Sequence, residues 1–302
     1  MINILSRALC FVAIIAVGFL LRRSGFFKRE DFTLLSRIVI NITLPAAIIN
    51  NLNGRELEPS LLVLVLVGFL YGVVLMIVGY MLNRRRGPDA QAFAMVNSSG
   101  VNISNFVLPF AQGFLGPEGV MATSLFDVGN GVICLGGSFG VAGAVLDKEK
   151  GFSFRPILRS VLKSVPLMTY VSMCLLAVLR IRLPEPVTTL VGIVGGANAF
   201  LAMLMLGIGF QVDSTRLREV VRTLLPRYLT GAVLAALCYS LLPVPAAYRG
   251  AVIIPFLGPI GSAAPAFTAQ LKGDYELASA INSFSILIST VLIIAALMII
   301  GA

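Results

Sequence analysis

Two apolar stretches of the sequence are interrupted by polar and helix-breaking residues of the kind that bind small anions. The first reads MVNSSGVNISNFVLP over residues 95–109, and the second reads IIPFLGPIGSAAPAF over residues 253–267. Proline removes a backbone donor and clashes with the preceding turn, and Ser, Asn and Gly loosen a helix further. We therefore expect each stretch to form two half-helices with unpaired N–H groups at the break. Such N-termini carry partial positive charge and suit a carboxylate or another anion.

The candidate binding residues are the polar and helix-breaking residues of these two stretches. They are Asn102, Ser104, Asn105 and Pro109 in the first stretch, and Gly258, Ser262 and Pro265 in the second. A single break of this kind is also typical of a proline kink packed closely through small residues. Two breaks at matched positions favour a binding site, because unwound backbone at membrane depth persists only where it lines a cavity or is buried in protein.

Asp127 is the acidic residue that the sequence places well inside an apolar segment, with Asn130 one helical turn later. A carboxylate inside a membrane is costly and indicates function by default. Asp127 could carry a coupling proton, hold a cation or orient the first broken helix; the alternative is a structural carboxylate held by helix ends. Asn282 occupies the corresponding neighbourhood late in the chain, where interhelical hydrogen bonding is an equal alternative.

The composition identifies the class of protein. Of 302 residues, 58% are hydrophobic and only 12% are charged, so the chain is expected to be an all-α polytopic membrane protein. Histidine is absent, and the four cysteines lie in apolar stretches without metal-ligand spacing. Neither a zinc protease nor an aspartyl dyad can be assembled, so we expect no enzyme, no metal site and no cofactor other than a coupling proton or sodium ion.

Ten segments are long and apolar enough to cross a bilayer. They run over about 4–21, 33–51, 59–82, 90–113, 119–146, 157–180, 186–210, 223–243, 248–271 and 275–301. The net charge of +9 comes from Lys and Arg gathered in the odd-numbered connections, such as Arg84–Arg86. By the positive-inside rule these connections are cytoplasmic and both termini are extracytoplasmic, in a multi-pass protein of the plasma (bacterial inner) membrane. The basic charge therefore predicts contact with lipid and no nucleic-acid partner.

Five segments precede the charged loop at 147–156 and five follow it. An odd number in each half means that residues 1–146 and 157–302 enter the membrane from opposite sides, as inverted repeats. Similar turns follow the two broken segments: Pro109 is followed by FAQGFLGPEG and Pro265 by AFTAQLKGDYE. The matched breaks then lie in segments four and nine.

The sequence resembles the auxin efflux carrier family, which includes plant PIN carriers and bacterial permeases for malonate, malate or other carboxylates. The resemblance rests on the opening at Val17–Asn50, Asn102 and Pro109 in segment four, the Asp-x-Gly-Asn pattern at Asp127–Asn130, and Pro265 before a Gly–acid loop. It covers nearly the whole chain.

The resemblance implies a fold like that of bile-acid symporters and sodium/proton antiporters, in which helices four and nine cross at their prolines. Helices 1, 2, 6 and 7 would form a scaffold that pairs as a homodimer, and helices 3–5 and 8–10 would form a moving transport domain. Asn102 would then approach the substrate carboxylate.

The function that these features predict is secondary transport, or facilitated movement, of small organic anions by alternating access. The alternative is a cation antiporter of the same fold. Such antiporters usually place two or more carboxylates at the crossing, whereas the sequence offers only Asp127 at that depth.

Overall fold

The computed structural model describes residues 2–56, 59–147, 153–210 and 216–301, and within these ranges the chain is helical with no β-strand. The first half contains α1 Ile2–Arg23, α2 Asp31–Ile38, η1 Val39–Thr43, α3 Leu44–Leu52, η2 Pro59–Leu62, α4 Val63–Leu82, α5 Pro88–Ser99, η3 Ile103–Val107, α6 Leu108–Phe110, η4 Ala111–Leu115, α7 Gly116–Val132, η5 Ile133–Gly137 and α8 Ser138–Leu146. The second half contains α9 Arg155–Lys163, α10 Val165–Val178, α11 Glu185–Gly196, α12 Asn198–Gly209, α13 Leu217–Leu241, α14 Ala246–Phe256, α15 Ala264–Gln270 and α16 Tyr275–Ile300.

Seven helices in the described ranges are long and apolar enough to cross a membrane. An eighth candidate is the pair α9 and α10, which bends by 72° at Ser164. The polytopic all-α class is thereby confirmed. The ten predicted crossings exceed this number because the fourth and ninth are interrupted: α5, α14 and α15 have 12, 11 and 7 residues, each too short to span alone.

The interruptions occur where the sequence predicts them. Helix α5 ends at Ser99, because Gly100 takes an extended conformation with ψ 151°. After the break, Pro109 lies between two π-helical turns, η3 and η4, since its missing N–H cannot serve the carbonyl four residues back. In the second half α14 ends at Phe256, directly before Gly258 and Pro259.

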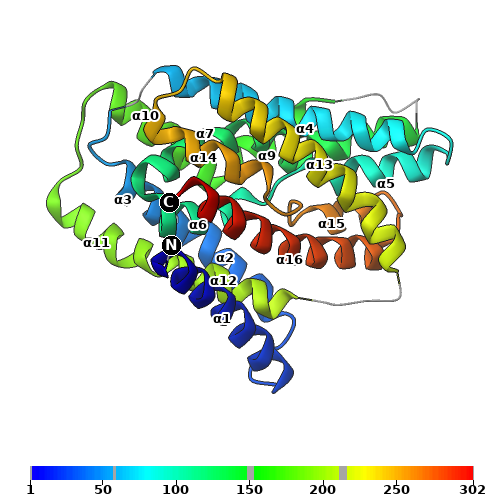
Figure 1. The fold of residues 1–302 in the computed structure, drawn as a ribbon, viewed down its shortest axis with the longest axis horizontal. Helices are drawn as coiled ribbons and strands as arrows, with labels where there is room; N and C mark the ends of the chain where they lie inside the picture. The colour runs from blue at the N-terminus through cyan, green and yellow to red at the C-terminus, as the bar shows by residue number, and fades with distance from the viewer. Residues whose placement is uncertain (1, 57–58, 148–152, 211–215, 302) are drawn as a thin grey trace.

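The helices can be followed as two groups, which also contact each other through α3 and α10 against α7 and through α1 against α16 (Figure 1). In one group α1 lies along α12, and α3 contacts both α10 and α11, while α2 contacts α12. In the other group α4 packs on α5 and α7, α14 contacts α7 and α13, and α16 contacts α13 and α15. The contacts are close: a Cβ on Gly129 of α7 would lie 1.8 Å from the Val65 carbonyl oxygen of α4.

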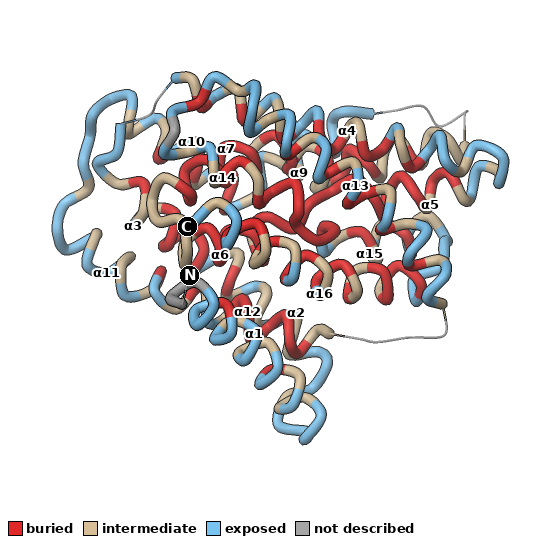
Figure 2. Tube along the Cα trace, in the orientation of Figure 1, coloured by how far each residue is buried: buried red, intermediate tan, exposed pale blue. Residues whose placement is uncertain are grey.

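Burial concentrates where the broken segments run (Figure 2). Asn97, Ser99 and Asn130 have at most 1% of their surface exposed, although they are polar. The outer helices α1 and α11 present large apolar side chains outward, among them Leu20 and Ile193. An apolar exterior around a core that buries these polar side chains suits a lipid environment, because lipid cannot hydrogen-bond to polar groups.

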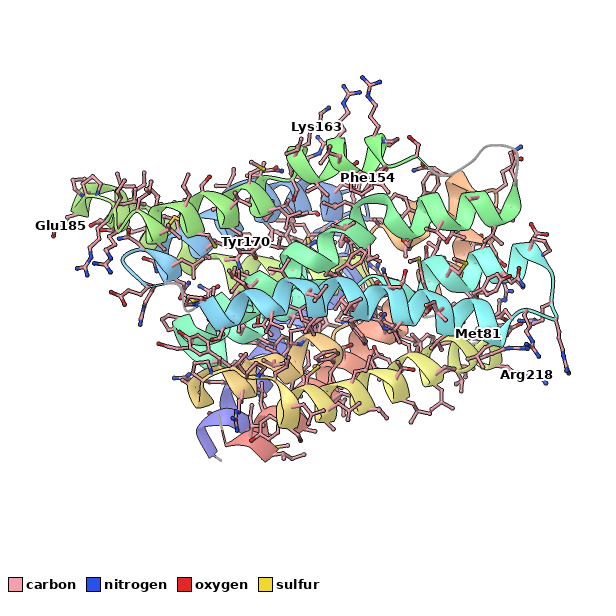
Figure 3. The ribbon with its side chains drawn as sticks, turned by 90° about the horizontal axis from the view of Figure 1, so that it is seen from above. Met81, Phe154, Lys163, Tyr170, Glu185 and Arg218 are labelled. Carbon is pink, nitrogen blue, oxygen red and sulfur yellow. The ribbon has the colours of Figure 1, made fainter. Side chains whose placement is uncertain are left out.

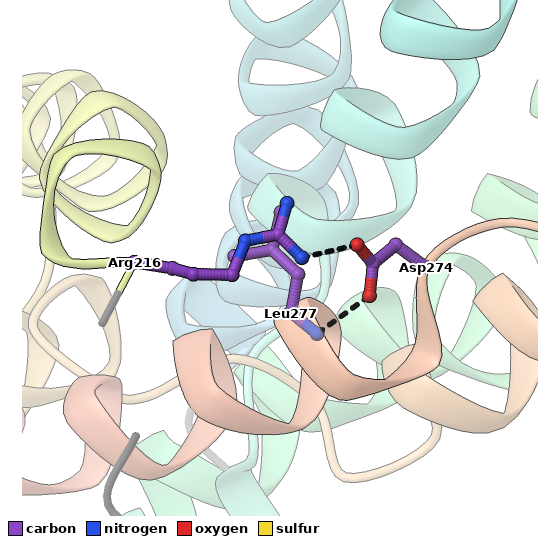
Figure 4. A network of polar contacts seen from close by, with 3 residues as sticks. All are labelled: Arg216, Asp274 and Leu277. Carbon is purple, nitrogen blue, oxygen red and sulfur yellow. Dashed lines mark hydrogen bonds and ion pairs between the residues drawn. The ribbon is translucent and has the colours of Figure 1, made fainter. Parts of the chain in front are cut away.

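The basic connection after α4 and the basic start of α13 lie at one end of the molecule. Met81 and Arg218 lie at this end in Figure 3, and Glu185 lies at the opposite end. Here Arg216 makes an ion pair with Asp274, which also caps α16 by accepting the Leu277 N–H at 2.9 Å (Figure 4). Burial alone would raise the pKa of Asp274, but the hydrogen bonds from Arg216 and Leu277 lower it below its ordinary value.

The predicted central loop at 147–156 lies partly outside the described residues, which exclude 148–152. The division at this loop into two inverted repeats therefore stays a prediction.

Candidate functional site at the crossing of the two broken segments

The two breaks lie against each other in space. Val101 and Ile260 form an antiparallel β-bridge, in which Asn102 N–H donates to Pro259 O at 2.9 Å and Gly261 N–H donates to Gly100 O at 3.0 Å. Backbone that has left its own helix is thus paired with backbone from the other half of the chain. The close approach needs glycine, since a Cβ on Gly100 would lie 2.5 Å from the Cys134 sulfur.

The Asn130 side chain of α7 holds the first break. Its Oδ1 accepts the Val101 N–H at 3.0 Å, and its Nδ2 donates to Val101 O at 2.9 Å. The same Nδ2 donates to Asp127 Oδ1 at 2.9 Å. One amide therefore serves both polar groups of an unwound residue and orients the neighbouring carboxylate.

Helix α16 serves the second break in a corresponding way. Ser285 Oγ accepts the Ile260 N–H at 3.1 Å, and Asn282 Nδ2 makes a longer bond of 3.4 Å to Gly261 O. Asn282 thus lies at the crossing, but its contact is weaker than that of Asn130.

Asp127 is buried, with 5% of its surface exposed. It accepts hydrogen bonds from Ser104 Oγ at 2.7 Å and from Asn130 Nδ2 at 2.9 Å. These bonds link α7 to the start of η3. The bond from Ser104 suits an Asp127 that orients the first broken helix. That Asp127 carries a coupling proton stays a prediction.

Arg227 of α13 is a functional candidate that the sequence interpretation missed. It is 1% exposed, and its guanidinium donates to Gly258 O at 2.9 Å, to Pro259 O at 3.2 Å and to Ser98 O. The signal was present in the sequence: an arginine follows Pro226 inside the apolar segment at 223–243. A charge at that depth indicates function as much as Asp127 does.

A cavity of about 700 Å³ adjoins the crossing and brings together five of the predicted residues. These are Asn102, Asn105, Ser262, Pro265 and Asn282. The opposite wall comes from α2 and α12, through residues such as Thr33 and Met205. Arg29, Glu30 and Tyr275 line it toward the end with the basic connections.

A smaller cavity of about 130 Å³ lies beside it and contains Ser104, Asp127 and Asn130. Asn102, Asn105 and Ser262 line both cavities and therefore form a shared wall.

Two predicted residues line neither cavity. Pro109 is buried in α6, and Gly258 uses its carbonyl for Arg227. The backbones meet at Val101 and Ile260, before both Pro109 and Pro265 in the chain. The prolines shape the second half-helices rather than mark the point of contact.

The shared wall can donate hydrogen bonds to an anion. Asn102 Oδ1 accepts the Asn105 N–H at 3.3 Å, which turns the Asn102 side chain so that its Nδ2 remains a donor. Within the described residues, no hydrogen bond holds the Asn105 side chain, and its Oδ1 is buried without a partner. No group of three or more His, Cys, Asp and Glu capable of holding a metal ion occurs in the same ranges.

Comparison with known proteins relates the chain to membrane transport proteins. The family described as membrane transport protein matches residues 4–139, which include the first break, Asp127 and Asn130. This match confirms the predicted family resemblance over residues 4–139.

A relative from Methanothermobacter thermautotrophicus, described as an uncharacterized transporter, is 25% identical over 204 residues. The match covers 65% of this chain and 65% of the relative. Both similarities are to transport proteins rather than to enzymes.

Proposed function

We propose that this protein is a secondary transporter or facilitator that moves small organic anions, carboxylates in particular, across the plasma membrane. The observation that carries the proposal is the shared wall of Asn102, Asn105 and Ser262 beside two crossing breaks. Paired broken helices at the middle of a membrane protein are the usual substrate site of secondary transporters. Amide donors recognise a carboxylate without needing a metal ion.

The helix packing supports alternating access. The 700 Å³ cavity lies between α2 and α12 of one group and the crossing with α16 of the other. We assign the first group to the scaffold, with dimer formation through it, and the second to the transport domain of ten helices in two inverted repeats. Movement of one group past the other would carry the shared wall from one membrane face to the other.

Uptake of labelled mono- and dicarboxylates into proteoliposomes tests the proposal. We expect uptake above that of empty vesicles for at least one carboxylate. Asn105→Ala should raise KM at least about tenfold, since loss of one buried hydrogen bond to an ionised group costs about 1.5–3 kcal/mol. Asn41→Ala, on an exposed part of η1, should leave KM unchanged. Absence of flux for every carboxylate in the panel would refute the proposal.

A cation antiporter remains the second candidate, because Asp127 is a buried carboxylate next to unwound backbone. Asp127 is the only buried acidic side chain in the described ranges, which weakens this reading. A change in vesicle pH on adding sodium, without any organic anion, would favour it over carboxylate transport.

A further inference from the structure

Arg227 places a positively charged side chain beside the crossing of the two broken segments. Its guanidinium bridges Ser98 O at the end of α5 to Gly258 O and Pro259 O directly after α14. The two terminal nitrogens of the buried guanidinium donate to three backbone carbonyls, whereas its Nε has no partner within the described residues.

The charge balances a negative potential that the fold itself creates. The C-terminus of a helix carries about half a negative charge, and α5 and α14 both end at this point. Two such ends amount to about one negative charge, which one guanidinium offsets. Without a cation, carbonyl oxygens from two helix ends would face each other in a poorly solvated interior.

The same set of oxygens is what a bound cation would use. In transporters with broken helices, unwound carbonyls and half-helix C-termini coordinate sodium ions. Here the carbonyls of Ser98, Gly258 and Pro259 are taken by Arg227. The Arg227 guanidinium therefore occupies the carbonyl oxygens that a sodium ion would otherwise coordinate.

We propose that Arg227 is a positioning residue that acts as an internal cation, so that anion binding at the shared wall requires no sodium ion. The claim that anion binding needs no sodium ion rests on the proposed function. The claim that Arg227 holds the crossing together does not. Arg227 joins the two half-helices in one arrangement and thereby fixes Asn102, whose N–H bonds to Pro259 O.

The planar fork of arginine suits the three acceptors better than an ammonium does. Lysine would keep the charge but cannot reach both segments with parallel N–H groups. Arg227→Lys should therefore be intermediate between the wild type and Arg227→Ala. Arg218→Ala is the matched control, because Arg218 is an exposed arginine of the same helix.

The first arm of the test measures thermal unfolding of the purified protein without substrate. The wild type should unfold at the same temperature in sodium chloride and in choline chloride. Arg227→Ala should unfold at a lower temperature, and millimolar guanidinium should restore part of the loss. A cavity of about 310 Å³ reaches Arg227 from the basic end, through residues such as Asp89 and Thr223, and gives guanidinium a route of entry. Arg218→Ala should show neither effect.

The second arm measures carboxylate uptake in proteoliposomes. Wild-type uptake should be equal with sodium and with choline. The uptake rate of Arg227→Ala should fall at least tenfold. Added guanidinium should restore its activity, or the variant should come to need sodium. A purely structural arginine would give no such rescue in correctly folded protein.

Three results would overturn the inference. They are wild-type uptake or stability that depends on sodium, an Arg227→Ala protein as stable and active as the wild type, and folded Arg227→Ala that no cation rescues. If the wild type moves no carboxylate, the proposed function fails, and the unfolding arm still decides the role of Arg227.

Discussion

At the crossing, Asn130 makes two hydrogen bonds with the Val101 backbone and one with Asp127. Asn130→Ala would leave the buried Val101 N–H without a partner and remove a donor from Asp127, while Val101 O keeps its bond from Ile103 N–H. A buried unpaired amide costs about 1–3 kcal/mol. We expect a clearly lower unfolding temperature in detergent.

Asn282→Ala is the matched control for this prediction. Asn282 makes only the 3.4 Å bond to Gly261 O and is half-buried, so its loss should change the unfolding temperature little. Equal effects of the two substitutions would show that Asn130 does not hold the break.

Asp127→Asn should abolish or uncouple carboxylate uptake while the protein still reaches the membrane. The carboxylate accepts bonds from Ser104 and Asn130, both donors, and an amide would point its own N–H groups at one of them. We expect uptake at least tenfold slower, which corresponds to about 1.4 kcal/mol. Uptake measured across pH checks this, with Glu185→Gln at the far end as control. Full uptake with unchanged pH dependence would remove Asp127 from the mechanism.

At this scale the sequence predicted residue types better than partners. Asn102, Asn105 and Ser262 were found because polar residues inside apolar segments are rare, and the structure brings them to one wall. The pairing of Val101 with Ile260 could not be predicted, since backbone hydrogen bonds leave no mark on residue type. Arg227 could have been predicted in the same way as Asp127, because both are charged residues inside apolar segments.

At the scale of the elements, α16 begins at a residue with two roles. Asp274 caps the helix and pairs with Arg216, and two substitutions separate the roles (Figure 4). Asp274→Asn keeps a good N-cap and loses the ion pair, which is worth about 0–1 kcal/mol when partly exposed. Asp274→Ala loses both, and a cap is worth about 0.5–2 kcal/mol.

Unfolding of both variants should be compared with the wild type at several pH values. Because the folded pKa of Asp274 is lowered, its contribution is fully present above the ordinary pKa of about 4 and is lost as pH falls through the folded value. The difference between wild type and Asp274→Asn should therefore shrink in acid. A difference that grows in acid would contradict the direction of the shift.

The element boundaries were predictable where local chemistry decides them. Gly100 and Pro259 end regular helix for reasons visible in the sequence. The 72° bend between α9 and α10 was not predicted, although Ser164 takes an extended conformation immediately before Val165 and Pro166. Proline disfavours helix in the residue before it, so the signal near this bend was available but weak.

At the scale of the molecule, the two helix groups meet around the 700 Å³ cavity, which extends from the shared wall toward Arg29 and Tyr275. Both residues lie at connections with basic charge, which the positive-inside rule places in the cytoplasm. Composition and charge therefore predicted the class of protein, while the orientation stays a prediction. The side to which the cavity opens depends on packing between distant helices and could not be predicted.

The direction of this opening can be tested with Ser262→Cys, because Ser262 is exposed within the cavity wall. A membrane-impermeant thiol reagent should modify this variant faster in inside-out than in right-side-out vesicles, and a transported carboxylate should slow the reaction by occupying the wall. Arg85→Cys and Glu56→Cys, in exposed connections of the two ends, calibrate each face, and the wild type corrects for the four native cysteines. Faster modification of Ser262→Cys in right-side-out vesicles would mean either that the assigned orientation is wrong or that the cavity opens outward at rest. Arg85→Cys distinguishes the two cases, because it also reacts faster in right-side-out vesicles only if the whole molecule is inverted.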